Sequence, residues 1–244
     1  MSKTPEETAP AEIYYNLTEA QKYHFNSRIN KIQRELTIRA LELLEINNEE
    51  NGIVFIDIGS GSGISSRVLE ENNLMHVGVD LSLEMLKIHQ RNSLNSNNSH
   101  SKHAESSLLE LFSLDIGNDM PFKEGTFDYA ISISVIQWLF QSYKREHIPS
   151  VRIKNFFQSL YRIINKKAVL QFYCNKREVE ILMKYSRAAG FTGGLQIDNE
   201  GTKNQKYYLI LDKNGNKSCR KHNKKDINEI KRKKRKHLHK RKNK

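Results

Sequence analysis

Apolar residues recur along the chain with the period of helices and the period of strands in turn. From Thr18 to about Ile46 they are spaced three and four residues apart, which predicts one amphipathic helix. Residues 53–56 form a wholly apolar run, typical of a strand that is buried on both faces. The first 17 residues include Pro5 and Pro10, and we expect them to form an extended arm.

Six more strands are predicted, at residues 75–79, 108–114, 127–133, 168–173, 191–197 and 207–211. Helices are expected after the turn at 59–63, after Ser82 as a cap, after Pro149, and up to a stop at Gly190. This alternation predicts a parallel sheet with helices on both faces. Because no helix separates the last two strands, they suggest an antiparallel hairpin. The predicted fold is therefore α/β and Rossmann-like, with a seven-stranded, mostly parallel sheet.

Charge divides the chain into parts. Residues 213–244 contain 16 Lys+Arg and 2 Asp+Glu, a net of +14; from totals of 40 and 28, this leaves 24 and 26, a net of −2, for residues 1–212. A nearly neutral body excludes a uniformly basic, histone-like protein. Residues 92–107 are rich in Asn, Ser and His and predict a low-complexity surface insertion. We expect an arm at 1–17, a domain at 18–212 with this insertion, and a disordered basic tail at 213–244.

Several protein classes are excluded by composition. No stretch approaches the roughly 20 apolar residues of a membrane span, and the first ten residues lack the apolar core of a secretory signal. Cys174 and Cys219 alone give neither a disulfide framework nor a cysteine zinc site. The histidines His89, His100 and His103 have no convincing ligand spacing, so no metal site is predicted. The expected compartment is reducing, either cytosol or nucleus.

The strongest local signal is a glycine-rich turn between a predicted buried strand and a helix. It comprises Asp57, Gly59, Ser60, Gly61 and Gly63. Glycines there allow positive φ and close approach of the backbone to a ligand. The spacing fails the dinucleotide fingerprint, which requires a third glycine one position later. D-x-G-x-G-x-G is instead typical of the adenosylmethionine site of Rossmann-like methyltransferases.

Two acids follow the next two predicted strands. Asp80 ends the second strand, where a carboxylate can accept hydrogen bonds from a ribose diol. Asp115 follows the third strand and suits a contact to an adenine amino group, with the Ile116 N–H facing a ring nitrogen. The alternative is that Asp57 and the glycines only make a tight turn, which leaves both other acids unexplained. The candidate cofactor-binding residues are Asp57, Gly59, Ser60, Gly61, Gly63, Asp80, Leu81, Asp115, Ile116, Ser132 and Arg28.

Four further segments resemble one family, the eukaryotic 18S ribosomal RNA (guanine-N7)-methyltransferases. They are PAEIYY at 10–15, FDYAISISVIQWL at 127–139, AGFTGGL at 189–195 and KYYL at 206–209. The resemblance covers residues 5–212, and the tail shares the family's basic character. Ser60 stands where the family usually has Cys, the insertion at 92–107 is extra, and the tail is shorter than usual.

The resemblance implies methyl transfer from S-adenosyl-L-methionine to N7 of a guanine in 18S rRNA, during small-subunit biogenesis. N7 has a free lone pair at neutral pH, so no general base is required. The candidate catalytic residues are Ser134, Gln137 and Trp138. Trp138 would stack on guanine and Gln137 would bond its Watson–Crick edge. Alternatively, Trp138 fills the core.

Two other features have open interpretations. Tyr14 and Tyr15 either form part of a lid over the site or pack the arm onto the domain. Arg28 either meets the methionine carboxylate of the cofactor or belongs to a solvated helix face.

The partners are also implied by the resemblance. It implies pre-40S particles, and a small zinc-binding activator subunit that covers the edge of the third strand near Leu108, Leu109, Leu111 and Phe112. Alternate residues of that strand could equally be core. The basic run at 231–242 predicts a nuclear import signal and an electrostatic anchor on RNA, so the nucleus is expected, with the cytoplasm as a second compartment.

Two alternative functions are open at this stage. One is an RNA-binding assembly factor with incidental catalysis, and the other is a methyltransferase for a protein or small molecule.

Overall fold

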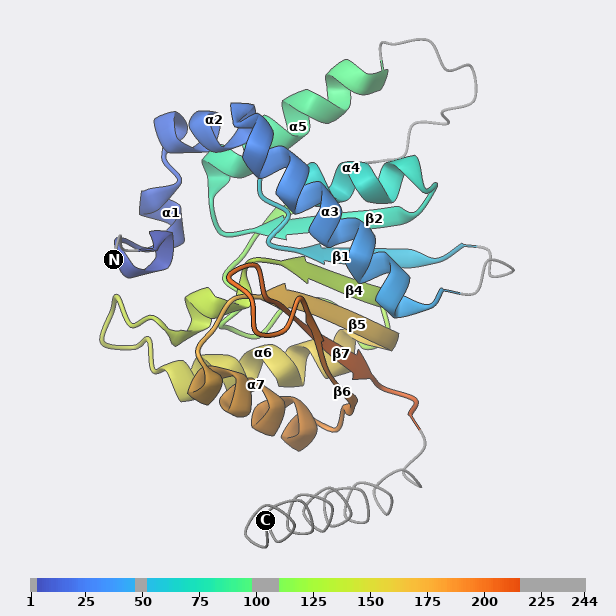
Figure 1. The fold of residues 1–244 in the computed structure, drawn as a ribbon. Coiled ribbons are helices and arrows are strands. Elements are labelled where there is room, and N and C mark those ends of the chain that lie inside the picture. The colour runs from blue at the N-terminus through green and yellow to red at the C-terminus, as the bar shows by residue number, and fades with distance from the viewer. Residues whose placement is uncertain (1–3, 47–51, 98–109, 216–244) are drawn as a thin grey trace, which may run out of the picture. The chain divides into compact units, whose positions relative to one another are not determined.

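The computed structural model describes residues 4–46, 52–97 and 110–215. Its centre is a seven-stranded sheet of order β3-β2-β1-β4-β5-β7-β6 (Figure 1). The strands are β1 (Val54–Ile58), β2 (Met75–Asp80), β3 (Glu110–Ser113), β4 (Phe127–Ile133), β5 (Ile164–Phe172), β6 (Thr192–Asp198) and β7 (Lys206–Asp212). β7 pairs antiparallel with both β5 and β6, and the remaining pairs are parallel. The predicted sheet, including its C-terminal hairpin, is confirmed.

Helices cover both faces of the sheet because the central strands are apolar on both sides. Phe55 of β1 packs in a layer with α3 (Ser27–Leu44), whereas its neighbour Ile56 packs in the opposite layer. That opposite layer contains the short helix η2 (Ile136–Phe140), α6 (Pro149–Ile163) and α7 (Lys176–Ala189). α4 (Ile64–Glu71) packs on α3, and α5 (Leu83–Asn97) packs on α2 (Leu17–Phe25) and β3. Figure 1 shows the two helical layers above and below the sheet.

The N-terminal segment differs from its prediction in two respects. It is not extended: η1 (Pro5–Glu7) and α1 (Ala11–Tyr14) are short helical turns. The single helix expected from Thr18 to Ile46 is two helices, α2 and α3, which meet at Asn26. Asn26 has extended backbone angles, and its side chain accepts a hydrogen bond from the Ile29 N–H at 3.0 Å. An N-cap of this kind begins a new helix and so breaks the run.

Three other boundaries also differ or lie outside the description. α5 continues to Asn97, so residues 92–97, predicted to be part of the insertion, are helical. The rest of the insertion lies outside the described residues. β5 begins at Ile164, four residues before the predicted start. Of the tail at 213–244, only 213–215 are described, and Lys213 still hydrogen-bonds to Lys166 and Ile164 of β5. Within the described residues, no helix has the length and apolar character needed to cross a bilayer.

The strand order reverses between β1 and β4. β2 and β3 lie on one side of β1, whereas β4 and β5 lie on the other. Connections therefore leave the carboxyl ends of β1 and β4 in opposite directions and open a crevice there. This is where the predicted site residues meet.

Candidate functional site

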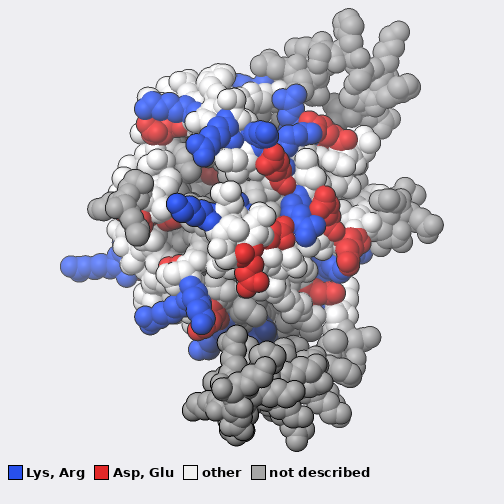
Figure 2. Space-filling model, viewed as in Figure 1, with Lys and Arg blue, Asp and Glu red and all other residues white. Residues whose placement is uncertain are grey.

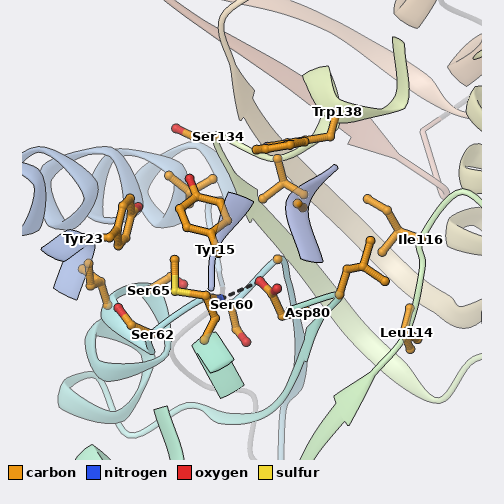
Figure 3. Close-up of a pocket in the computed structure, with 18 of the residues that line it drawn as sticks. Tyr15, Tyr23, Ser60, Ser62, Ser65, Asp80, Leu114, Ile116, Ser134 and Trp138 are labelled. Carbon is orange, nitrogen blue, oxygen red and sulfur yellow. Dashed lines mark hydrogen bonds between the residues drawn. The ribbon is translucent and has the colours of Figure 1, made fainter. Parts of the chain in front are cut away.

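A cavity of about 860 Å³, part of it open to solvent, lies at the carboxyl ends of β1, β2 and β4. Its wall contains the glycine turn after β1, the acid that ends β2, the loop after β3 and Trp138 of the segment after β4 (Figure 3). The predicted site residues that line it are Gly59, Ser60, Gly61, Asp80, Leu81, Asp115, Ile116, Ser134 and Trp138. Residues from distant parts of the sequence thus converge as expected for strand ends in a parallel sheet.

The glycine turn is shaped by positive φ angles and tight contacts. Gly59 has a φ of +72°, and a Cβ there would lie 2.1 Å from Cγ2 of Val135. The Gly59 and Ser60 amides both donate to the Val79 carbonyl, and the Gly63 amide donates to the Ser60 carbonyl. These N–H groups therefore already have acceptors, in β2 and within the turn. The turn offers a bare backbone surface and the buried, unpartnered hydroxyl of Ser60.

Asp80 in the cavity is held by two backbone amides. Its Oδ2 accepts a hydrogen bond from the Gly61 N–H at 2.9 Å, and its Oδ1 accepts one from the Ser82 N–H at 2.8 Å. Burial raises the pKa of Asp80 to about 6, against the lowering effect of these bonds. Each carboxylate oxygen has a further lone pair. Asp80 is therefore fixed in orientation with capacity for additional donors.

Asp115 lies in the cavity wall but already has a cationic partner. Both of its oxygens accept from the guanidinium of Arg152 on α6, at 2.8 and 2.9 Å. Oδ1 also accepts from the Gly117 N–H at 2.9 Å. Asp115 stands two residues beyond the end of β3 and is thus held by a bidentate ion pair across to the next helix. Arg152 was not predicted from the sequence, because one arginine on an amphipathic helix resembles an ordinary surface residue.

Five predicted residues do not line this cavity. Asp57 is fully buried, and its Oδ2 accepts from the hydroxyls of Ser65 and Ser66 at 2.6 and 2.7 Å, which ties β1 to α4. Burial raises its pKa to about 6. Ser132 is fully buried within β4, and Gln137 donates to the Ser134 carbonyl at 2.7 Å.

The last two of the five lie on the far side of the turn or on the surface. Gly63 caps the start of α4 and lines a second cavity instead. Arg28 is exposed at the start of α3, so its prediction as a cofactor ligand is not supported and the solvated-face interpretation fits. An exposed arginine and a buried one have the same appearance in a helical pattern, so the sequence alone does not distinguish a solvated arginine from one that faces the cavity.

The segment after β4 forms the other side of the cavity. Ser134 has a φ of +61°, unusual for a residue with a side chain, and its hydroxyl donates to Gln171 Oε1 at 2.9 Å. Trp138 is half-buried in the cavity wall, whereas Leu139 is fully buried. The structure therefore does not place Trp138 wholly within the core.

The N-terminal aromatic residues lie over this cavity. Tyr15 lies above Asp80, with Tyr23 and Trp138 on either side, at ring distances of 5.7 and 6.0 Å (Figure 3). The Ser82 hydroxyl donates to the Tyr15 carbonyl at 2.9 Å and so ties the arm to the loop after β2. Burial raises the pKa of both tyrosines well above the ordinary value. Of the predicted lid pair, Tyr15 lines the cavity, whereas Tyr14 packs on Tyr15 and Trp138.

Other lining residues were not anticipated. They include Tyr23, Gln33, Ser62, Ser65 and Arg152. Tyr23 and Gln33 belong to helices that pack over the crevice from outside the sheet, and no spacing rule relates them to a strand end. Ser62 lies within the glycine turn and Ser65 follows it closely, so both could have been included from their adjacency alone.

Comparison with known proteins defines the class. Residues 56–172 match the family model described as a methyltransferase domain. The fold is similar to that of magnesium protoporphyrin IX methyltransferase from Synechocystis, solved with bound SAM, with a TM-score of 0.62 and 15% identity over 86% of this chain and 98% of that one. The fold is thus that of the class I methyltransferases.

The relatives identify the family. The 18S rRNA (guanine-N(7))-methyltransferase of Schizosaccharomyces pombe is 40% identical over 88% of this chain and 76% of its own length. The 18S rRNA (guanine(1575)-N(7))-methyltransferase of Saccharomyces cerevisiae is 38% identical over 82% and 68%. The chain belongs to the 18S rRNA (guanine-N7)-methyltransferase family, whose cofactor is S-adenosylmethionine.

The cavity fits that cofactor. The backbone is bare at Gly59, where any side chain would clash with Val135. Ser60 has a buried hydroxyl without a partner, and Asp80 can accept further hydrogen bonds. The donors and acceptors are all oxygen and nitrogen, as a nucleoside requires, and the described residues contain no cluster of metal-ligating side chains.

Proposed function

We propose that this protein transfers a methyl group from adenosylmethionine to N7 of a guanine in 18S rRNA. The observation that supports it most is the convergence of Gly59, Asp80 and Asp115 in one cavity of a chain that belongs to this family. We infer that Asp80 accepts from the ribose hydroxyls and that Ile116 and the Arg152-held Asp115 face the adenine. Gly59, Ser60, Gly61 and Leu81 form the floor, whereas Asp57 and Gly63 position the turn from behind.

When bound, the cofactor supplies a methyl group on a positively charged sulfur. The guanine N7 lone pair forms the new bond to carbon as the carbon–sulfur bond breaks, and the positive charge passes from sulfur to the base. No proton moves in this step, so the chain needs no general base. Its contribution is alignment and exclusion of water, effects that reach about 7–11 kcal/mol in well-oriented reactions.

The target base enters, in this proposal, beside Trp138 and Ser134. Trp138 stacks on guanine, and Tyr14 and Tyr15 close the cavity from the arm. We propose no residue for the Watson–Crick contact that was predicted for Gln137, because the Gln137 amide is buried and donates to the Ser134 carbonyl. Gln137 instead supports the positive-φ conformation of Ser134 as a positioning residue.

The test is a transfer assay with the purified protein, radiolabelled adenosylmethionine and small-subunit rRNA. Digestion of the product to nucleosides should give labelled N7-methylguanosine as the only labelled product. Trp138→Ala should lower kcat/KM at least tenfold. Phe140→Ala, a change at the aromatic residue two positions further on, which does not line the cavity, should lower it much less. Label in another nucleoside, in protein or in a small molecule would contradict the proposal.

We also propose a protein partner at the β3 edge. β3 is an edge strand of the sheet. Of the residues predicted for this edge, Phe112 is 42% exposed and Leu111 is half-buried, whereas Leu108 and Leu109 lie outside the described residues. An open strand edge with an exposed aromatic residue suits pairing with another chain. The implied occupant is the small zinc-binding activator subunit. Coexpression with that subunit should raise soluble yield, and Phe112→Asp should abolish copurification; a fully soluble and active monomer would contradict a required subunit.

Localisation and RNA anchoring rest on the basic tail. We propose that residues 213–244 direct the protein to the nucleus and attract RNA, because their net charge is +14. Pre-40S particles are the proposed setting of the reaction.

A further inference from the structure

A second cavity lies behind the glycine turn, between α3, α4 and α5. By the same measure as the first it holds about 1280 Å³, part of it open to solvent. Ser62 and Ile64 line both cavities, so the turn between β1 and α4 separates them. Nothing in the proposed methyl transfer uses this space.

Its inner wall contains polar atoms that lack partners. His89 of α5 is only 1% exposed, and neither of its ring nitrogens has a hydrogen-bond partner. The same holds for Ser62 Oγ and His24 Nδ1, which belong to residues of the same wall. Burying polar atoms without partners is unfavourable, and native proteins rarely do it without water or a ligand to satisfy them.

The His89 ring occupies space that is free because Gly63 and Gly78 have no side chains. A Cβ on Gly63 would lie 2.4 Å from His89 Cδ2, and one on Gly78 would lie 3.3 Å from Cε1. Burial lowers the pKa of His89 to about 3, so the ring is neutral and presents one N–H donor and one acceptor. The Asn92 amide, which donates to the Ser62 carbonyl at 3.3 Å, adds a second polar group of the same kind. Such groups suit the edge of a nucleobase.

The outer rim is cationic on balance. Lys31, Arg34 and Arg67 face two carboxylates there, Glu70 and Glu71. Glu71 pairs with both arginines, at 2.5 Å to Arg34 and 3.7 Å to Arg67, and so fixes them while leaving most of their N–H donors available. Lys31 is exposed and makes no ion pair within the described part of the chain. A phosphate group fits this rim better than a neutral ligand.

We propose that this cavity binds one nucleotide, with its phosphate at Lys31, Arg34 and Arg67 and its base toward His89 and Asn92. The inference rests on the proposed function, because the RNA substrate is the expected source of the nucleotide; a free nucleotide has the same chemistry. A nucleotide in this cavity contacts Ser62, which belongs to the turn that also shapes the cofactor cavity.

The experiment measures RNA and nucleotide binding by the full-length protein. Lys31→Glu and Arg67→Ala are compared with Lys123→Glu, an equal change at an exposed lysine just before the amino end of β4. Fluorescence anisotropy with a labelled small-subunit rRNA fragment, at several salt concentrations, should show affinity about tenfold weaker and a salt slope shallower by about one for each cavity variant. Lys123→Glu should remain within about twofold of the wild type.

Calorimetry with guanosine 5′-monophosphate and with inorganic phosphate separates the parts of the site. His89→Phe retains a ring but removes both nitrogens, and it should weaken the nucleotide more than phosphate; a thermal melt checks that it folds. Loss of nucleotide binding in the cavity variants with unchanged RNA affinity would assign the site to a free nucleotide. Equal binding of RNA and of nucleotide by Lys31→Glu, Arg67→Ala and Lys123→Glu would overturn the proposal and leave a water-filled cavity.

The same data separate this inference from the proposed function. Methylation of rRNA by the wild type with no effect of Lys31→Glu or Arg67→Ala on binding would refute only the second site. Binding of guanosine 5′-monophosphate that depends on Lys31, without any transfer to rRNA, would refute only the proposed reaction.

Discussion

At the scale of single residues, Asp80 combines two opposing effects. Burial favours its neutral form, while the Gly61 and Ser82 amides favour its carboxylate. The result is an acid whose pKa, about 6, lies close to physiological pH. A carboxylate that must accept from a ribose diol is needed in its charged form, so binding of cofactor and protonation of Asp80 oppose each other.

This opposition predicts the pH dependence of cofactor binding. Affinity for adenosylmethionine should be constant above the pKa of Asp80 and fall by up to about tenfold for each pH unit below it, because the free protein then takes up a proton that binding must release. Calorimetry from about pH 5 to 8 measures this. Asp80→Asn should bind weakly with a much flatter pH profile. Equal wild-type affinity at both ends of that range would contradict the assignment of Asp80.

The Arg152–Asp115 pair gives a second residue-scale prediction. Arg152→Met leaves Asp115 without its bidentate partner, and we expect a loss of about 1–3 kcal/mol in cofactor binding because the acid is no longer fixed. Arg152→Lys should not restore it, since an ammonium cannot make the paired geometry. Arg39→Met, which breaks another Arg–Asp pair at 2.9 Å to Asp198, is the matched control. If Arg152→Met and Arg39→Met bound the cofactor with equal affinity, the role of Arg152 would be rejected.

Asp80 and Asp115 were predictable and Arg152 was not, for a physical reason. Residues that follow parallel strands share one edge of the sheet, so strand prediction alone brings them together. Arg152 reaches the site from a helix on one face, through packing that sequence spacing does not encode. Gln137 and Ser132 show the opposite case: both lie close to the cavity in sequence but do not line it, because Ser132 is buried within β4 and the Gln137 amide turns back to the Ser134 carbonyl.

At the scale of elements, the turn between β1 and α4 depends on contact with the segment after β4. Gly59 combines a positive φ with the approach of Val135, so it links two strands on either side of the switch point. Strand and helix positions were predicted well because both faces of the sheet are apolar. The break at Asn26 was missed because the apolar spacing continues across it, although asparagine is a common N-cap.

Gly59→Ala is predicted to destabilise the protein by about 2–4 kcal/mol, the sum of backbone strain and the clash with Val135. Urea unfolding measures the change. Gly201→Ala is the matched control, because Gly201 has a φ of +78° with nothing within 4 Å of a Cβ, so only the strain of about 1 kcal/mol remains. Adding Val135→Ala to Gly59→Ala should recover part of the loss. Equal effects of the two glycine substitutions would show that the contact with Val135 is unimportant.

At the scale of the whole molecule, the body and the tail differ in charge. Figure 2 shows basic and acidic side chains interspersed on one face of the described body, in keeping with the net charge of −2 of residues 1–212. RNA affinity without the tail must therefore come from local sites, whereas the tail supplies a long-range attraction that salt screens. The sequence predicted this division because charge can be counted without a fold.

Removal of residues 217–244 should weaken binding to pre-ribosomal RNA and flatten its salt dependence, since most of the excess positive charge is deleted. Anisotropy over a range of salt concentrations gives the slope. Affinity for adenosylmethionine should not change, which serves as the internal control. An unchanged salt slope in the truncated protein would remove the tail from the account of RNA binding.

The central claim, that the cavity beside Asp80 methylates guanine N7 in the small-subunit RNA, is tested most directly in cells. N7-methylguanosine is mapped at single-nucleotide resolution along 18S rRNA in cells that express only the wild type or only Asp80→Lys. The account predicts one guanine that is modified with the wild type and unmodified with the variant, at equal protein levels. Full modification of that guanine in cells with Asp80→Lys alone would contradict it.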